Sequence, residues 1–442
     1  MRYDALMDAS AHFRDKRITV MGLGLLGRGV GDARYLAECG AKLIVTDLKS
    51  REELSESVAQ LESFKNITFV LGEHRLEDFR ERDLILKAAG VPLDSPYIAE
   101  AEKNGISVRM SADLFAEISG TPCIGVTGTR GKSTVAHMLE AILKESGKKV
   151  LLGGNVRGVS TLALLKESTP EHVAVLELDS WQLQGFGEAR ISPHISVFTT
   201  LYPDHLNYYK DHPEMYLADK ANIFLYQIPS DTLILGKQCA PTIIEKYGDH
   251  IESKTLVVDE LKLPDTWILR IPGQHNRYDA ALALAAARAI DVSDETSRTA
   301  LESFAGVPGR LELIREVKGI KIYNDTTSTT PEATLAALAA LDPTHVVLIM
   351  GGTDKNLDMN TLLVKLAEVK RVILLVGTGT SRVLEFLPNA SVFDDLSKAV
   401  HEAFVATEPG DTLLFSPAFT SFGMFKNEFD RGDQFTAIVK AL

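Results

Sequence analysis

Short apolar runs alternate with segments of helical periodicity along most of this chain. Residues 18–21 have the composition of a buried strand, whereas residues 135–143 place apolar side chains at the i, i+3, i+4, i+7 and i+8 positions of one helix face. This alternation predicts α/β units built on parallel sheets. Further strands are expected at residues 43–46, 123–126, 173–176, 195–199, 321–323, 346–350, 372–376 and 412–415, and helices at residues 112–118, 216–224 and 279–290.

The chain of 442 residues is long enough for about three domains at roughly 150 residues each. Glycine and proline cluster at residues 120–122 and 306–309, where they interrupt the alternating pattern. We therefore expect an α/β protein with three domains, at residues 1–119, 120–305 and 306–442. The first and third are expected to be Rossmann-like, and the central one to be a P-loop ATPase-type domain with a parallel sheet.

The composition excludes several classes of protein. Apolar residues make up 45% of the chain and charged residues 24%, which is typical of a globular protein. The 47 Lys and Arg residues are outnumbered by 60 Asp and Glu residues, so the net charge is −13. We therefore expect neither nucleic acid nor an anionic membrane as a partner, and any phosphorylated ligand must be bound by local loops.

The cysteine content and the hydropathy indicate a compartment. Cys39, Cys123 and Cys239 are odd in number and too far apart for a disulfide framework or a CxxC metal site. Residues 1–17 lack the apolar centre of a signal peptide, and no stretch approaches 18 consecutive apolar residues. We expect a cytoplasmic protein.

The strongest local signal is the segment GTRGKST at residues 128–134, between an expected strand and an expected helix. Glycines let backbone N–H groups point at phosphate oxygens, and the helix N-terminus adds the positive end of its dipole. Lys132 would reach the β- and γ-phosphates, and a hydroxyl of Ser133 or Thr134 would ligate Mg²⁺. The spacing GxxxxGK[ST] is not met, because Val126 stands five positions before Gly131, but the shorter form GTxGKST fits. The alternative is a glycine-rich turn that binds nothing.

A second glycine-rich segment, GLGLLG at residues 22–27, follows the first strand, and Asp47 ends the next one. The pattern is typical of a dinucleotide fingerprint. Alone it is compatible with NAD, with another nucleotide diphosphate, or with a tight turn.

Four further side chains have both a functional and a structural interpretation. Glu177 ends a buried strand, where it would be a metal ligand or a surface acid. Taken alone, a histidine such as His205 more often has a structural role than a functional one. Lys220, taken alone, is expected to be an exposed lysine on a helix. Asn276 would either read a purine edge or cap a helix.

Two polar loops follow strands of the third expected domain. Residues 324–331 (NDTTSTTP) and residues 416–425 (SPAFTSFGMF) combine hydroxyls with turn residues. Such loops at the carboxyl ends of strands face ligands in α/β proteins, although a helix N-cap explains part of the first one.

Together these segments resemble the Mur ligase family, and within it the glutamate-adding members. The motifs follow the family's order over nearly the whole chain: GTRGKST, GGN at residues 153–155, LELDSWQL, the pair Asp204 and His205, GQHN, PGR, NDTTSTT and SPAFTSFGMFKN.

The resemblance implies an ATP-dependent amide-forming ligase whose cofactors are ATP and Mg²⁺. A carboxylate of UDP-N-acetylmuramoyl-L-alanine would be phosphorylated, and glutamate, expected to be the D form, would displace the phosphate. L-Glutamate or another amino acid is the nearest alternative, and a monomer is expected. The alternatives outside this group are a folate polyglutamylating enzyme, an alanine-adding ligase, an NAD-dependent dehydrogenase and a non-catalytic nucleotide-binding regulator. Folate polyglutamylating enzymes lack a UDP domain, and alanine-adding ligases more commonly carry GTHGKT.

The resemblance also implies roles for individual residues. The UDP-muropeptide would contact Gly24, Leu25, Leu26, Asp47, Gly90, Asn155 and His205. ATP would contact Gly128, Thr129, Arg130, Gly131, Lys132, Ser133, Thr134, Asn276, Arg310 and Asp325. Metal ligands would be Ser133, Glu177, His205 and Lys220, the last as a carbamate, and the catalytic group would comprise Lys132, His205, Lys220 and Arg310. The incoming amino acid would contact Thr327, Thr329, Ser421 and Lys426.

The chain departs from the glutamate-adding pattern at four places. Thr327 stands where a lysine is common, so Lys426, Lys355 or backbone N–H groups would have to hold the glutamate carboxylate. Gly309 replaces a histidine, Asp279 replaces an asparagine, and Glu428 precedes Phe429 in reverse of the usual order.

Overall fold

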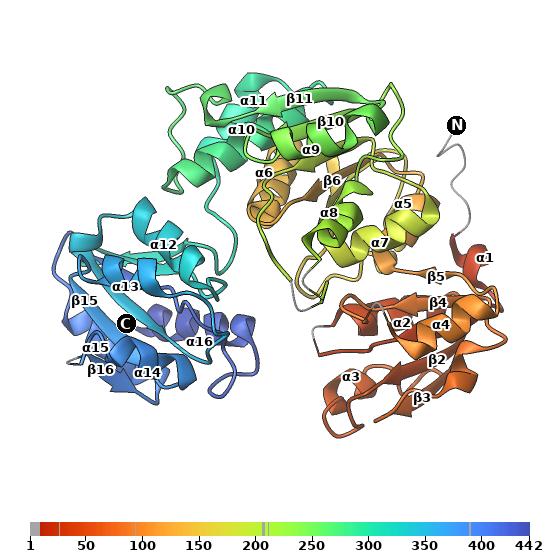
Figure 1. Ribbon diagram of the computed structural model, residues 1–442, viewed down its shortest axis with the longest axis horizontal. Coiled ribbons are helices and arrows are strands. Elements are labelled where there is room, and N and C mark those ends of the chain that lie inside the picture. The colour runs from red at the N-terminus through yellow and green to blue at the C-terminus, as the bar shows by residue number, and fades with distance from the viewer. Residues whose placement is uncertain (1–8, 26, 93, 206–207, 211, 389) are drawn as a thin grey trace. The chain divides into compact units, whose positions relative to one another are not determined.

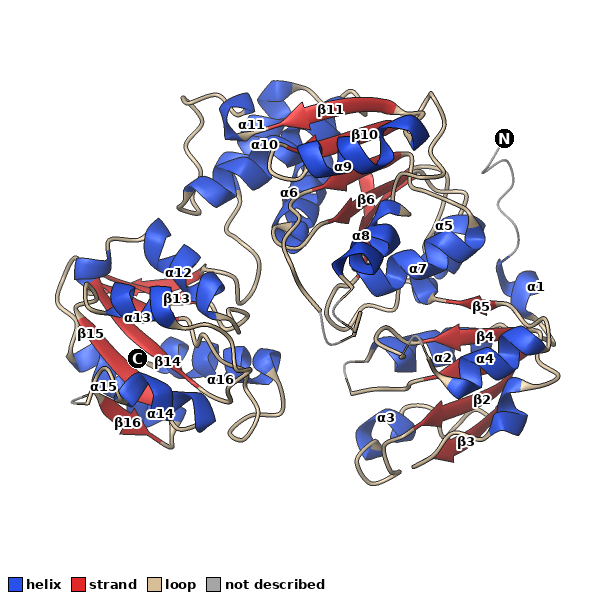
Figure 2. Ribbon diagram, viewed as in Figure 1, coloured by secondary structure: helices blue, strands red, loops and turns tan. Residues whose placement is uncertain are grey.

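The computed structural model describes residues 9–442 except 26, 93, 206–207, 211 and 389 (Figure 1). It divides into two compact units, residues 1–264 with 279–301 and residues 265–278 with 302–442. The described residues form three sheets, each lying among helices (Figure 2). The predicted α/β architecture is confirmed, whereas the boundaries at 119/120 and 305/306 stay predictions.

The first sheet is parallel, with the order β3-β2-β1-β4-β5. Its strands are β1 (Arg17–Met21), β2 (Lys42–Asp47), β3 (Ile67–Leu71), β4 (Leu84–Lys87) and β5 (Val108–Arg109). The accompanying helices are α1 (Ala9–Phe13), α2 (Arg28–Glu38), α3 (Ser55–Ala59), α4 (Pro96–Lys103) and α5 (Ser111–Ile118). Because the strand order reverses at β1, the loops after β1 and β4 leave a crevice at the carboxyl end of the sheet, where such folds bind ligands.

The second sheet belongs to the same unit and is also parallel, with the order β11-β10-β9-β6-β8-β7. Its strands are β6 (Cys123–Thr127), β7 (Lys149–Gly154), β8 (His172–Glu177), β9 (Ile195–Phe198), β10 (Thr232–Gly236) and β11 (Lys254–Val258). Its helices are α6 (Lys132–Glu145), α7 (Ser180–Ala189), α8 (Pro213–Ala221), α9 (Ala240–Tyr247), α10 (Gln274–Arg288) and α11 (Asp294–Ser303). The order reverses at β6, which therefore delivers residues 128–131 to a second crevice.

The third sheet is mixed, which refines the expectation of a purely alternating βα pattern. Its order is β12-β13-β17-β14-β15-β16, and β12 runs antiparallel to β13 while the other pairs are parallel. The strands are β12 (Glu312–Val317), β13 (Ile320–Asn324), β14 (Val346–Gly351), β15 (Arg371–Leu375), β16 (Ser391–Phe393) and β17 (Thr412–Phe415), with helices α12 (Pro331–Ala340), α13 (Asn360–Leu366), α14 (Thr378–Leu384), α15 (Leu396–Val405) and α16 (Glu428–Ala441). A two-residue turn, Lys318 and Gly319, joins β12 to β13, and both residues have positive φ, as a tight hairpin turn requires.

The apolar face predicted for α6 is confirmed, since Val135, Met138, Leu139, Ile142 and Leu143 are fully buried. The helix ends at Glu145, with Ser146 as its C-cap, and Gly147 follows with φ 80°. Among the described residues, no helix is both long and apolar enough to span a bilayer.

Candidate functional site

The loop between β6 and α6 has the geometry of a phosphate-binding loop. Gly128 has φ 139°, and a Cβ added there would lie 2.0 Å from Thr199 Oγ1, so a side chain at this position has no room. Gly131 has φ 87° and precedes the first residue of α6. The backbone N–H groups that begin α6 therefore point out of the carboxyl end of the sheet, where an anion is stabilised.

Two lysines converge on the same carbonyl of this loop. Lys132 Nζ donates to Gly128 O at 3.0 Å and to Thr129 O at 3.1 Å. Lys220 Nζ donates to Gly128 O at 2.9 Å and to Thr127 Oγ1 at 3.2 Å. Lys132 thus lies folded over the loop, in reach of phosphates bound there.

Lys220 is only 1% exposed, so the interpretation as an exposed helical lysine is wrong. Burial lowers its pKa well below the usual value, and the positive charge of Lys132 lowers it further. A neutral, nucleophilic amine is therefore stabilised at this position.

The acidic strand end beside the loop holds Glu177, which is buried. Asn155 donates its backbone N–H to Glu177 O at 2.7 Å and its Nδ2 to Glu177 Oε1 at 3.5 Å. Within the described ranges, no three His, Cys, Asp or Glu side chains gather closely enough to hold a metal ion alone. Mg²⁺ usually takes one or two carboxylates together with waters and phosphate oxygens, so a single carboxylate such as Glu177 would suffice for a magnesium ion that arrives with a nucleotide.

His205 adopts a left-handed backbone conformation, with φ 53°. Its ring lies 4.6 Å from the ring of Trp181, and burial lowers its pKa. The imidazole is therefore stabilised in its neutral form, which can accept a hydrogen bond or bind a metal.

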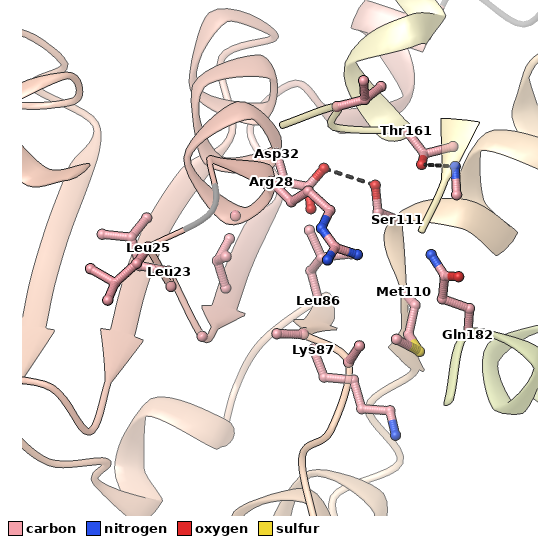
Figure 3. Close-up of a pocket in the computed structure, with 18 residues that line it drawn as sticks. Leu23, Leu25, Arg28, Asp32, Leu86, Lys87, Met110, Ser111, Thr161 and Gln182 are labelled. Atoms are coloured by element: carbon pink, nitrogen blue, oxygen red, sulfur yellow. Dashed lines mark hydrogen bonds between the residues drawn. The ribbon is translucent and has the colours of Figure 1, made fainter. Parts of the chain in front are cut away.

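The crevice of the first sheet contains a cavity of about 220 Å³ (Figure 3). Gly24 and Leu25 line it, and Gly24 donates its backbone N–H to Asp47 Oδ2 at 3.0 Å. Asp47 also accepts from the backbone N–H of Lys49, so this carboxylate holds the glycine loop in place. Leu25 is 58% exposed, and Gly90 lies in the exposed turn after β4 with φ 78°. Leu26 lies outside the described residues.

The wall of this cavity contains a buried carboxylate, Asp32, that the sequence patterns did not single out. Asp32 Oδ1 accepts from Ser111 Oγ at 2.8 Å and from Ser160 Oγ at 2.6 Å. Burial raises the pKa of Asp32 to about 6, although the two hydroxyls and Arg28 oppose the shift. The cavity also takes in Arg28 and Lys87, two cations that the sequence patterns did not single out.

In the other unit, three loops follow the carboxyl ends of β13, β14 and β17. Asp325 accepts from Ser328 Oγ at 2.5 Å, from Ser416 Oγ at 2.7 Å and from the backbone N–H of Leu311 at 2.9 Å. Burial raises its pKa to about 6, and Arg310 acts in the opposite direction. Asp325 therefore ties the first and third loops together.

The loop after β14 contacts the loop after β13 at a residue expected to bind the amino acid, Thr329. Lys355, an exposed residue after β14, donates Nζ to Thr329 Oγ1 at 3.2 Å. Thr327 Oγ1 donates to Gly309 O at 2.9 Å. Ser421 is buried and Lys426 is exposed, both on the loop after β17.

Asn276 and Arg310 also belong to this unit, because the boundary between the units lies within α10, after Tyr278. Asn276 is buried and donates Nδ2 to Pro272 O at 2.5 Å. Because α10 begins at Gln274, Asn276 lies inside the first turn and the N-cap alternative is wrong. Arg310 is exposed, and its backbone N–H donates to Val307 O at 3.0 Å.

Three family models match the chain in order. They are "Mur ligase MurD-like, N-terminal domain" at residues 16–110, "Mur ligase middle domain" at residues 126–259 and "Mur ligase, glutamate ligase domain" at residues 309–419.

Individual proteins match over nearly their whole length. The UDP-N-acetylmuramoylalanine--D-glutamate ligase of Roseiflexus sp. (strain RS-1) is 37% identical, over 96% of this chain and 98% of the relative. That of Geobacillus kaustophilus (strain HTA426) is 33% identical, over 99% of this chain and 100% of the relative. The crystal structure of UDP-N-acetylmuramate-alanine ligase MurC from Thermotoga maritima is similar with a TM-score of 0.61, over 96% of this chain and 99% of that one. At 15% identity this likeness shows the fold alone.

Proposed function

Because this chain belongs to the Mur ligase family, we propose that it joins D-glutamate to UDP-N-acetylmuramoyl-L-alanine, with hydrolysis of ATP to ADP, in the synthesis of peptidoglycan precursors. The observation that carries the proposal is the match, in order, of a MurD-like first domain, a middle domain and a glutamate ligase domain on one chain. The glycine pattern at residues 22–27 was also compatible with an NAD-dependent dehydrogenase, but the three Mur ligase matches argue against that function.

The reaction has two steps. A carboxylate oxygen of the alanyl group attacks the γ-phosphorus of ATP, and the bond to the bridging oxygen breaks to release ADP. The glutamate amine then attacks the acyl phosphate, loses a proton, and expels inorganic phosphate through a tetrahedral intermediate. Catalysis of such steps depends on positioning and on neutralising phosphate charge.

The loop at residues 128–134 is proposed to bind the triphosphate, with Lys132 moving from Gly128 O and Thr129 O onto the γ-phosphate. The same loop comprises Gly128, Thr129, Arg130, Gly131, Ser133 and Thr134. Glu177, His205 and the hydroxyl of Ser133 are proposed ligands of Mg²⁺, which supplies positive charge to the phosphates when bound.

Lys220 is proposed to act as a carbamate. Its neutral Nζ would attack the carbon of CO₂ and lose a proton, which converts a cation into an anion that can ligate Mg²⁺. The buried position and the lowered pKa of Lys220 support this step, because a protonated amine has no lone pair with which to react.

The loops after β13, β14 and β17 are proposed to serve the nucleotide and the amino acid. Asn276, Arg310 and Asp325 would contact ATP. Thr327, Thr329, Ser421 and Lys426 would contact glutamate. Since Thr327 supplies no cation, we propose that Lys355, which is bonded to Thr329, binds a glutamate carboxylate.

The first domain is proposed to bind the UDP-muropeptide. Gly24, Leu25, Leu26, Asp47 and Gly90 would hold the UDP part, and Asn155 and His205 the muropeptide. The protein is proposed to act in the cytoplasm as a monomer, which light scattering on the purified chain of 48.3 kDa would check.

The test uses the purified protein with ATP, Mg²⁺, UDP-N-acetylmuramoyl-L-alanine and a panel of amino acids. We expect phosphate release and an amide product with D-glutamate only. Release with L-glutamate or with another amino acid would select the alternative substrate, and no release with any of them would contradict the proposal.

A further inference from the structure

Arg28 occupies a position that local helix energetics disfavour. It is the first residue of α2 and follows Gly27, which has φ 83° at the N-cap. A cation at a helix N-terminus opposes the helix dipole and destabilises the helix. The charge is therefore not explained by the stability of α2.

The side chain of Arg28 extends from α2 to Asn155, the residue that follows β7. Its Nη1 donates to Asn155 Oδ1 at 2.7 Å. In the part of the chain that the structure describes, this is the one hydrogen bond of the guanidinium, and Arg28 forms no ion pair there. A guanidinium carries five N–H groups, so donors remain for a ligand.

Figure 3 shows the guanidinium turned into the cavity, toward Ser111 and Gln182. Among the described residues that line the cavity, the one carboxylate, Asp32, already accepts hydrogen bonds from Ser111 and Ser160. Arg28 is thus a cation beside a glycine loop and a helix N-terminus, a combination suited to phosphate groups.

The bond to Asn155 also fixes the orientation of the Asn155 amide. Because a guanidinium only donates, Asn155 presents Oδ1 to Arg28, and its Nδ2 then faces Glu177 Oε1. Arg28 is therefore connected through one amide to the carboxylate proposed as a metal ligand.

We propose that Arg28 binds the diphosphate of the UDP-sugar substrate directly, while its bond to Asn155 aligns that amide with Glu177. This inference rests on the proposed function, which supplies the UDP-sugar. It makes Arg28 a residue that determines affinity for the sugar nucleotide and not for ATP.

The test measures binding of UDP-N-acetylmuramoyl-L-alanine, UDP, uridine and ATP to the full-length protein by calorimetry, without glutamate. Because Arg28→Met removes a charge-assisted hydrogen bond, it should weaken binding of the substrate and of UDP by about 10- to 100-fold. Binding of uridine and of ATP should change by less than about threefold, and Arg28→Lys should be intermediate because it keeps the charge. The loss should shrink at high ionic strength.

The matched control is Arg34→Met, on the same helix, whose guanidinium donates to the side chain of Gln60. Circular dichroism checks that each variant is folded. Unchanged affinity of Arg28→Met for UDP and for the substrate would overturn the inference. If the wild type binds no UDP-sugar, that result contradicts the proposed function, and with it the inference.

A second comparison separates direct contact from action through Asn155. In an Asn155→Ala background, Arg28→Met should still weaken UDP binding at least fivefold. No further loss in that background would show that Arg28 acts through Asn155 alone, and would overturn the direct contact.

Discussion

The ammonium groups of Lys132 and Lys220 share one acceptor, the carbonyl oxygen of Gly128, at 3.0 and 2.9 Å. Two positive charges so close together destabilise each other, and the buried partner, Lys220, has the lowered pKa. In the proposed function the two groups have different tasks: Lys132 binds a phosphate of ATP, and Lys220 reacts with CO₂ as a neutral amine, which its lowered pKa favours.

Lys132→Ala removes the cation that would neutralise the γ-phosphate. Removal of one group that stabilises developing charge typically costs 10²–10³ in turnover, so we expect kcat to fall at least about 100-fold. Phosphate release assays measure this. Lys144→Ala, at an exposed lysine of the same helix that pairs with Glu140, is the control and should keep full activity. More than a few per cent of activity in Lys132→Ala contradicts the assignment.

Lys220→Ala removes the proposed carbamate. Activity should fall at least about 100-fold and should be restored in part by acetate or another small carboxylate, which would occupy the space of the missing anion. The same carboxylates should not restore Lys132→Ala, because that variant lacks a cation. Full activity of untreated Lys220→Ala would rule out the carbamate.

Lys355→Ala tests the proposed amino-acid contact. Loss of one charge-assisted hydrogen bond should raise KM for D-glutamate by about 10-fold or more, with KM for the UDP-muropeptide unchanged. Lys365→Ala, on α13 at a lysine that pairs with Glu368, is the control. If KM for glutamate moves only in Lys426→Ala, the carboxylate is held on the loop after β17 instead.

Asp32 gives the first unit a pH-dependent stability. Because burial raises its pKa to about 6, above the value of about 3.9 in an unfolded chain, the folded state binds the proton more tightly. Its stabilising contribution is complete below about pH 4 and is lost as pH rises through 6. Asp32→Asn accepts the same hydroxyl bonds without a charge, so between pH 5 and 7.5 the wild type should lose on the order of 1–3 kcal/mol of unfolding free energy relative to this variant.

Denaturant unfolding of the wild type and of Asp32→Asn over that pH range measures the difference in unfolding free energy. Burial also raises the pKa of Asp113 to about 6, but both proteins contain Asp113, so its contribution cancels in the difference. The control is Asp83→Asn, since Asp83 is an exposed carboxylate whose pKa is lowered by the backbone N–H of Arg17. Its difference from the wild type should be constant from pH 5 to 7.5. A constant difference for Asp32→Asn as well would contradict the raised pKa.

Much of the fold could be predicted from the sequence, because the hydropathy patterns of strands and helices in parallel α/β units depend on residues that are close in sequence. The apolar run at β6, the loop glycines and the face of α6 each depend on neighbours within about 20 residues. The antiparallel strand β12 was missed, since its side chains are mostly half-buried and alternate weakly.

The candidate site was less predictable where residues act through distant partners. Asp32 bonds to Ser160, which lies 128 residues further along the chain, and Arg28 bonds to Asn155 across 127 residues. Lys220 resembled a surface lysine because the charge and the helical context are local, whereas its burial depends on packing against β6 and its loop. A signal for Arg28 was present, namely a cation at a helix N-terminus beside a glycine loop.

In the proposed reaction, a carboxylate of the sugar nucleotide attacks ATP before the amide forms. The direct measurement uses UDP-N-acetylmuramoyl-L-alanine labelled with ¹⁸O in the alanyl carboxylate, together with ATP and D-glutamate, and mass spectrometry of the released phosphate. One ¹⁸O should appear in the phosphate for each amide formed, because the carboxylate oxygen leaves on phosphorus. Amide formation with unlabelled phosphate would contradict attack of the carboxylate on ATP.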